Sequence, residues 1–104
     1  MKDAANILEL IKKSVSTTDP GAIIILYGSY ARGDFREDSD IDILVLIEKD
    51  KVTMDDRMRI SSSLNHISLE TGMLISPFVT SKKEWTNHKV TPFFENVKNE
   101  GIAL

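Results

Sequence analysis

The chain has 104 residues, the length of one domain, with 41% hydrophobic and 28% charged residues as in an ordinary globular protein. It contains no cysteine, which excludes disulfides and thiolate metal sites and is typical of a cytoplasmic protein. The net charge of −3 argues against a surface for duplex nucleic acid, and no apolar run is long enough to predict a membrane span. We therefore expect a single cytoplasmic domain over residues 1–104.

The first half of the chain predicts a helix followed by two strands. Apolar residues recur at helical spacing until a Pro-Gly pair at residues 20–21 ends the helix. Residues 22–27 (AIIILY) and 41–47 (IDILVLI) are rich in β-branched residues and lack alternation, which predicts strands buried on both faces. A glycine-serine turn and a polar loop over residues 34–40 separate them. The apolar positions of the helix are Ile7, Leu8, Ile11 and Val15.

The second half predicts a long helix, a strand and two short helices. The long helix is capped by Thr53 and ended by Gly72. Residues 73–80 form the third strand, and Pro77 limits it to a sheet edge or a bulge. The apolar positions predicted for the long helix are Met58, Ile60, Leu64, Ile67 and Leu69.

A capping-box pattern at residues 81–84 begins the first short helix, and Thr91 and Pro92 begin the second, which Gly101 ends. This order predicts an α/β (α+β) fold, a small mixed sheet of three strands with helices packed mainly on one face.

The stretch GSYARGDFREDSDIDILV, residues 28–45, carries the chemistry, but two common ligand loops do not match it. A phosphate-binding P-loop over residues 28–33 would continue with Lys-Ser or Lys-Thr, and an Asp-Phe pair follows instead. An EF-hand loop starting at Asp38 would need glycine at its sixth position and glutamate at its twelfth, where Ile43 and Lys49 stand. Both interpretations are rejected.

Asp40 and Asp42 predict a magnesium site at the mouth of the second strand. Side chains two apart on a strand point to the same face, so the two carboxylates repel each other unless a cation lies between them. Magnesium commonly uses one or two carboxylates together with substrate phosphates. The competing interpretation is a pair of solvated acids at a strand end, with Asp38 outside the pair in either case.

The turn before these acids favours the ligand site over the solvated pair. Gly28 permits a sharp turn and a close approach of the backbone to a ligand. Ser29 can open a short helix, whose first N–H groups and serine hydroxyl are donors for phosphate. Arg32 supplies a nearby cation, whereas Arg36 is interpreted as a solvated loop charge.

Gly28-Ser29 followed by Asp40-x-Asp42 resembles the minimal nucleotidyltransferases (MNT) of the DNA polymerase β-like nucleotidyltransferase superfamily. The wording YGSYARGDFREDSDIDILV is close to the family's, and looser similarity extends over the rest of the chain. The resemblance includes the MntA-like antitoxins of HEPN/MNT toxin–antitoxin pairs. It implies a polymerase β-like core.

The same resemblance implies an activity and its components. Ser29, with Gly28 and Arg32, would bind the triphosphate of ATP, and Asp40 and Asp42 would hold two magnesium ions as the catalytic carboxylates. A hydroxyl would attack the α-phosphate, and pyrophosphate would leave. Some relatives transfer AMP to a tyrosine of a HEPN-domain partner, which implies such a toxin as the partner.

One position departs from the family pattern. The superfamily carries a third carboxylate on the later strand, and Ser76 stands at the matching position. A serine cannot act as the carboxylate base or complete the metal ligand set. Two functions therefore remain open, an active nucleotidyltransferase and a weak or inactive module of the same fold that binds nucleotide, a HEPN-type partner, or both.

The C-terminal segment carries more apolar residues than one short helix needs. These residues favour core packing, and the alternative is a surface for a homo- or hetero-oligomer formed through the C-terminal helix. They are Phe93, Phe94, Val97 and Ile102.

Overall fold

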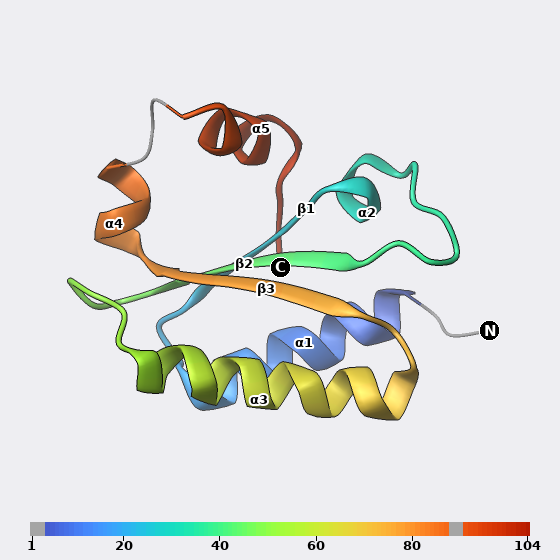
Figure 1. The fold of residues 1–104 in the computed structure, drawn as a ribbon, viewed down its shortest axis with the longest axis horizontal. Coiled ribbons are helices and arrows are strands. Elements are labelled where there is room, and N and C mark those ends of the chain that lie inside the picture. The colour runs from blue at the N-terminus through green and yellow to red at the C-terminus, as the bar shows by residue number, and fades with distance from the viewer. Residues whose placement is uncertain (1–3, 88–90) are drawn as a thin grey trace.

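The computed structural model of the chain describes residues 4–87 and 91–104, which form a four-stranded sheet and five helices (Figure 1). The fold class is the predicted mixed α/β class. The elements are α1 (Ala4–Thr18), β1 (Ile23–Tyr27), α2 (Ser29–Arg32), β2 (Ile41–Ile47), α3 (Met54–Thr71), β3 (Ile75–Ser81), α4 (Lys82–Asn87), α5 (Pro92–Glu100) and β4 (Ile102–Ala103).

The sheet has the strand order β3-β2-β1-β4, with β2 at its centre. β1 runs antiparallel to β2 and to β4, while β2 and β3 are parallel and are joined by the crossover helix α3. β3 lies at an edge, as Pro77 predicted, because an edge strand needs fewer backbone donors.

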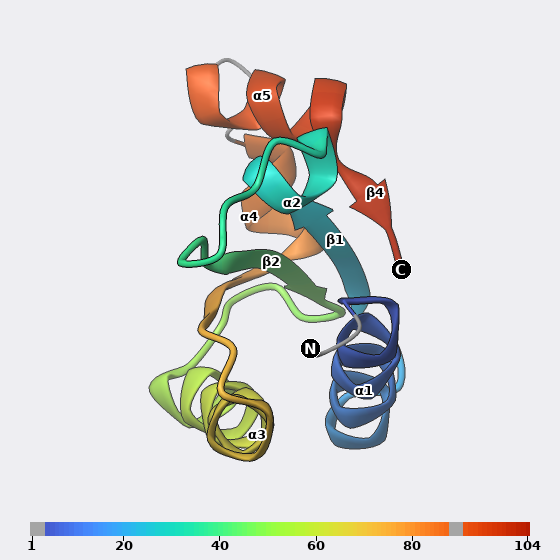
Figure 2. The same ribbon diagram turned by 90° about the vertical axis from the view of Figure 1, so that its right-hand side faces the viewer.

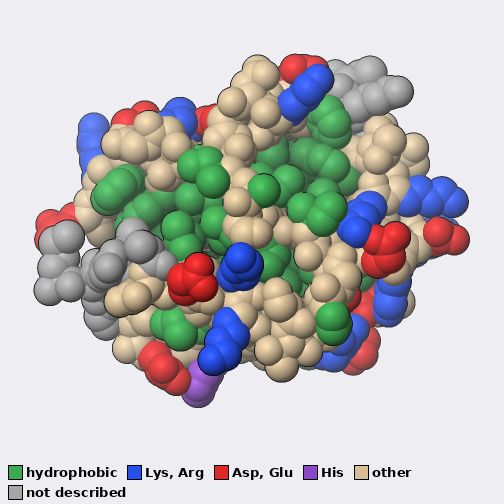
Figure 3. All heavy atoms as spheres, turned by 180° about the vertical axis from the view of Figure 1, so that it is seen from behind, with side chains coloured by type: hydrophobic (Ala, Val, Ile, Leu, Met, Phe, Trp, Pro, Cys, Tyr) green, Lys and Arg blue, Asp and Glu red, His purple; other side chains and the backbone are tan. Residues whose placement is uncertain are grey.

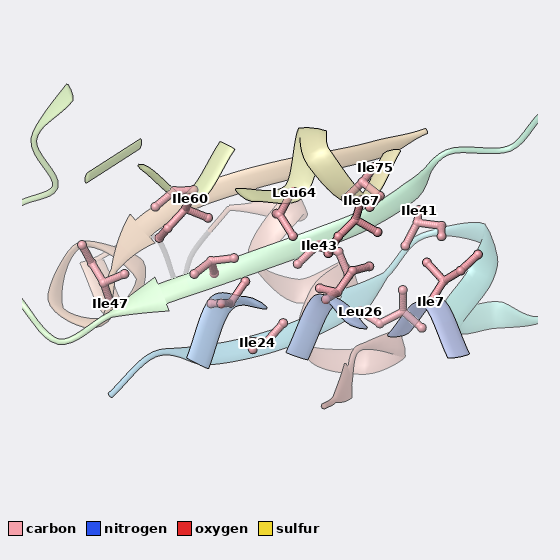
Figure 4. Close-up of a cluster of buried hydrophobic side chains, with 14 residues drawn as sticks. Ile7, Ile24, Leu26, Ile41, Ile43, Ile47, Ile60, Leu64, Ile67 and Ile75 are labelled. Carbon is pink, nitrogen blue, oxygen red and sulfur yellow. The ribbon is translucent and has the colours of Figure 1, made fainter. Parts of the chain in front are cut away.

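The two longest helices, α1 and α3, cover one face of the sheet, and the short helices α4 and α5 cover part of the other (Figure 2). Figure 4 shows the larger core, in which aliphatic side chains of α1 and α3 meet those of β1, β2 and β3. On the second face, Val97 of α5 packs against Leu44 and Leu46 of β2. This double cover explains why nearly every side chain of β2 is buried.

Two apolar positions predicted for α3 are wrong. Met58 and Leu69 are exposed over 60% and 85% of their surface, whereas Ile60, Leu64 and Ile67 are buried. The buried residues follow the helical repeat, and each exposed one lies two residues from a buried one, roughly 200° around the helix. Apolar composition alone had assigned them to the core.

The two strands predicted to be buried on both faces differ in the structure. β2 is buried as predicted, but in β1 only Ile24 and Leu26 are fully buried, and Ile23 is 42% exposed. β1 differs because its outer neighbour, β4, has only two residues, too few for the sequence to predict. Leu104 extends this pairing by donating its amide to the carbonyl of Ile24, 2.9 Å away.

The predicted ends of α5 are confirmed in position. The side chain of Thr91 accepts a hydrogen bond from the amide of Phe94, and Pro92 is the first helical residue. A side chain at Gly101 would collide with the carbonyl of Val97 and the side chain of Ile25, so glycine allows α5 to end against β1.

Seen from behind (Figure 3), hydrophobic side chains gather over the centre of the molecule. Three partly exposed apolar residues belong to α1, β1 and β4, the elements away from β3: Leu10, Ile23 and Ile102. Across residues 4–87 and 91–104, no helix is long and apolar enough to cross a membrane.

Candidate functional site

The residues predicted for the site meet at one end of the sheet. Tyr27, the last residue of β1, pairs with Asp42 near the start of β2, and Asp42 is in register with Ser76 near the start of β3. The short helix α2 begins two residues after Tyr27, at the right of Figure 1. Three strand ends and one helix start therefore converge there.

Gly28 lies directly against the Asp42 carboxylate. Its φ of +77° is in the range that residues other than glycine rarely adopt, and a Cβ at this position would collide with the carboxylate. The Gly28 carbonyl accepts the amides of Ala31 and Arg32, each at 3.1 Å, which starts α2. The glycine thus permits the turn that the sequence predicted and a close approach to Asp42, whereas its approach to a ligand stays a prediction.

Ser29 is the first residue of α2 and is half-buried beside Gly28. The amides of Ser29 and Tyr30 cannot be satisfied inside the helix, because the first N–H groups of a helix have no intrahelical acceptor. With the serine hydroxyl, these amides form a set of donors next to the two aspartates. Such a set can bind an anionic oxygen.

The two aspartates form a site of concentrated negative charge. Burial raises the pKa of Asp42 above its usual value, and the neighbouring charge of Asp40 raises it further. The positive charge of Arg32 acts in the opposite direction and does not cancel these effects. The pKa of Tyr27 is likewise raised, first by burial and then by Asp42. A cation bound here would relieve the repulsion.

The ligands present fit magnesium shared with a bound substrate. Both aspartates offer hard carboxylate oxygens, and Asp42 is half-buried while Asp40 is exposed. Within the part of the chain that the structure describes, no group of three or more His, Asp or Glu side chains is arranged to hold a metal. Asp40 and Asp42 could therefore hold magnesium together with phosphate oxygens, which is a common arrangement for this ion.

Ser76 lies beside Asp40 at the start of β3. Its hydroxyl donates a hydrogen bond to Oδ2 of Asp40, 2.9 Å away. The serine therefore orients one carboxylate oxygen of the pair without adding negative charge.

Arg32 is engaged by two carboxylates. Its guanidinium forms ion pairs with Asp34 (Nε to Oδ2, 3.2 Å) and with Glu100, the last residue of α5 (Nη1 to Oε2, 2.9 Å). About half of the Arg32 side chain stays exposed. A phosphate contact by Arg32 stays a prediction and would compete with these partners. Glu100 was not predicted, because 68 residues separate it from Arg32 and no local pattern connects them.

The remaining charged loop residues lie outside the site. Asp38 and Arg36 are exposed between α2 and β2, and the Arg36 amide donates to Oγ of Ser39 at 2.7 Å. This agrees with their interpretation as solvated loop charges.

Comparison with known proteins gives one family and close relatives. Residues 8–98 match the model of the nucleotidyltransferase domain family. The chain is 37% identical to a Methanocaldococcus jannaschii protein named "Putative protein adenylyltransferase MJ0141", over 94% of this chain and 95% of that protein.

Solved structures show the same fold. One titled "Structure of putative minimal nucleotidyltransferase" aligns with a TM-score of 0.68 and 25% identity, over 99% of this chain and 97% of the other. Another, titled "Crystal structure of the toxin-antitoxin with AMP-PNP", aligns with a TM-score of 0.63 and 20% identity, over 91% of this chain and 69% of the other.

Proposed function

Because the chain belongs to the nucleotidyltransferase domain family, we propose that it transfers AMP from ATP to a hydroxyl group of a partner protein in a magnesium-dependent reaction. The observation that carries this proposal is the turn at Gly28, which lies against the carboxylate of Asp42, whose pKa is raised in part by the neighbouring charge of Asp40. A protein acceptor is chosen because the Methanocaldococcus jannaschii relative is named as a protein adenylyltransferase.

A HEPN-domain toxin is the partner that we propose, with this chain as its cytoplasmic antitoxin. The sequence resemblance to MntA-like antitoxins supports this choice, as does one structural neighbour, which is described as a toxin-antitoxin. Of the apolar residues predicted for an oligomer surface, Ile102 is exposed and available for such a partner, whereas Val97 is buried in the protein's own core.

The proposed chemistry uses positioning and charge more than a covalent nucleophile. The Ser29 hydroxyl and the start of α2 would bind the triphosphate, and Asp40 and Asp42 would hold magnesium, which would neutralise phosphate charge. The acceptor oxygen forms a bond to the α-phosphorus as the bond to the bridging oxygen breaks. Pyrophosphate leaves, and the proton of the acceptor hydroxyl passes to solvent, since Ser76 is no base at neutral pH.

The test combines the protein, ATP labelled at the α-phosphate, magnesium and the protein encoded by the adjacent gene. We expect label on that partner and release of pyrophosphate, with both lost when EDTA replaces magnesium. Asp40→Ala and Asp42→Ala should abolish the transfer. No labelling by the unmodified protein, or equal labelling by the two variants, would contradict the proposal.

A second candidate function is a non-catalytic module that binds nucleotide or a HEPN-type partner. The observation that favours it is Ser76, which lies at Asp40 where the family carries a third carboxylate. In this case calorimetry should detect tight partner binding that Asp42→Asn does not weaken. Metal-dependent turnover of ATP would exclude it.

A further inference from the structure

A small aromatic pocket lies where α4 and α5 approach β3. Its volume is about 170 Å³. Among the residues that the structure describes, the side chains that line it carry no charge: Phe78, Thr80, Trp85, Thr91 and Phe93. A lining of these aromatic and hydroxyl side chains suits an apolar ring system rather than a phosphate or a carboxylate.

The pocket and the carboxylate site share one face of the sheet. Side chains alternate along a strand, so Phe78 lies on the same face as Ser76, about 7 Å further along β3. The register pairs Ser76 with Asp42 and Phe78 with Leu44, and Leu44 packs beneath α5. The path from the carboxylates to the pocket therefore runs along one face of two neighbouring strands.

A second contact joins the two regions on the β1 side. Tyr27 pairs with Asp42 between β1 and β2. The centroid of its ring lies 5.4 Å from that of Phe93, and the two ring planes meet at 80°. The ring centroid of Phe93 in turn lies 5.6 Å from that of Phe78 and 5.8 Å from that of Trp85. The rings thus hold one another in edge-on and tilted contacts, and these contacts fix the shape of the pocket.

The rings are held in place but are not covered. Phe78 and Phe93 remain 39% and 38% exposed, although both contact other rings. A cavity of roughly 150 Å³ is known to hold a benzene molecule, so the pocket has room for a planar ring but not for a whole nucleotide. The rest of a ligand would have to extend along β3.

We propose that this pocket binds the nucleobase of the nucleoside triphosphate by stacking, an inference that rests on the proposed function. With the α-phosphate at Asp40 and Asp42, the ribose would bridge the distance to Phe78. The Thr80 hydroxyl offers a hydrogen-bonding group in the pocket wall, and the aromatic faces offer the stacking surface that every base can use.

The first test uses Trp85, the single tryptophan of the chain, as a fluorescent reporter. ATP and adenosine should both quench its emission in a saturable way, and inorganic tripolyphosphate should not. Quenching by adenosine supports the pocket even if AMP transfer is never found. Absence of quenching by ATP and by adenosine overturns the pocket even if AMP transfer is found.

The second test separates stacking from packing. Phe78→Leu keeps an apolar side chain but removes the aromatic face, and it should weaken ATP binding about tenfold in equilibrium dialysis while leaving tripolyphosphate binding unchanged. Phe35→Leu is the matched control, because Phe35 is also exposed and stacks on Tyr30 at 4.2 Å, away from the pocket-lining side chains.

Phe35→Leu should bind ATP like the unmodified protein. A loss of ATP affinity in Phe35→Leu with none in Phe78→Leu would place the base elsewhere and overturn the proposal. An equal loss for ATP and tripolyphosphate in Phe78→Leu would also overturn it, since stacking acts on the base alone. Thermal unfolding of both variants checks that they are folded.

Discussion

The two ends of β2 lie next to aspartates whose pKa values are shifted in opposite directions. Asp56 follows the C-terminal end of β2 and lies in the first turn of α3. It is almost completely buried and accepts hydrogen bonds from the Lys49 ammonium group at 2.8 Å and from the Thr53 amide at 3.0 Å. These bonds, Lys49 first, hold the pKa of Asp56 far below its usual range. At the other end, burial and Asp40 raise the pKa of Asp42.

We interpret this difference as one between a structural carboxylate, Asp56, and a carboxylate that the proposed ligand would use, Asp42. Asp56 completes a capping box with Thr53 and has cationic partners within the protein. Asp42 has a like charge beside it and a glycine where a side chain would otherwise lie. Functional sites commonly keep such unfavourable charge, which a bound cation or substrate then stabilises.

The largest expected effect is on activity, at Asp42. Asp42→Asn should lower AMP transfer at least about a hundredfold, because a ligand of the proposed magnesium is lost. The same variant should have a higher Tm at pH 7, since a repelled, half-buried charge is removed. Transfer assays and thermal unfolding measure the two effects.

Asp38→Asn is the control for this prediction, because it removes an exposed acid from the preceding loop. It should change neither property. Undiminished transfer by Asp42→Asn, or a fall in its Tm, would show that Asp42 resembles Asp56 after all.

At the other end of β2 we expect the largest loss of stability. Asp56→Asn should lower the Tm by about 10 °C, since it leaves the charge of Lys49 without its buried partner and weakens the cap of α3. Transfer by the folded protein at 25 °C should be unchanged. Calorimetry and the labelling assay measure the two.

The neighbouring Asp55 gives the matched control. Its side chain is 87% exposed and pairs only loosely with Arg59, at 3.6 Å. Asp55→Asn should therefore shift the Tm by a degree or less, because exposed ion pairs contribute little. Equal losses in the two variants would contradict a special role for the buried carboxylate.

The sequence predicted the Asp42 end of this comparison better than the Asp56 end. Glycine, serine and two spaced aspartates within 15 residues form a local pattern, and the structure brings them together. For Asp56, the sequence predicted an acid in the first turn of α3, but its burial and its bond to Lys49 depend on how the β2–α3 loop folds. Local patterns do not encode such contacts.

Long-range contacts account for the rest of what was missed. The ion pair of Arg32 with Glu100 joins residues far apart in the chain, and β4 exists only because Gly101 brings the last residues against β1. The exposure of Leu69 follows from its place two residues after the buried Ile67, on the opposite side of α3, which apolar composition does not reveal. Periodicity applied strictly would have excluded Leu69.

Gly28 and its counterpart Gly33 test the geometry of the Asp42 end. Both have a positive φ, but a Cβ at Gly28 would meet the Asp42 carboxylate, whereas at Gly33 no described atom lies within 4 Å. Gly33→Ala should cost about 1 kcal/mol of folding free energy from backbone strain alone. Gly28→Ala should cost about 2 kcal/mol or more and should also weaken ATP binding.

Urea unfolding and equilibrium dialysis give the two readouts for these glycines. Equal costs and equal ATP affinities in the two variants would mean that the close approach of Gly28 to Asp42 has no functional role. A selective loss of ATP binding in Gly28→Ala would connect the turn to the carboxylates.

A smaller effect is expected from restoring a third acid. Ser76→Asp places another carboxylate beside Asp40 and should destabilise the protein by about 1 kcal/mol without metal. Magnesium should then raise the Tm more than it does in the unmodified protein. Ser76→Asn introduces a side chain of the same shape as aspartate but without charge, and it should show neither effect. An equal response of both variants to magnesium would contradict a metal role for this position.

The most direct comparison of the two carboxylates is the pH dependence of stability. The stability that Asp56 contributes is fully present above its unfolded pKa of about 3.9 and is lost as the pH falls below it. The Tm deficit of Asp56→Asn should therefore shrink in acid.

Asp42 has the opposite sign. Because its folded pKa is raised, its contribution is fully present below the unfolded pKa of about 3.9 and is lost as the pH rises through the folded pKa. The Tm advantage of Asp42→Asn should thus be absent near pH 3 and grow toward pH 7. Thermal unfolding of both variants and the unmodified protein across this range gives the difference in Tm between each variant and the unmodified protein. We expect the two differences to have opposite signs, each larger at pH 7 than at pH 3. Two differences of the same sign at pH 7 would mean that both carboxylates are structural.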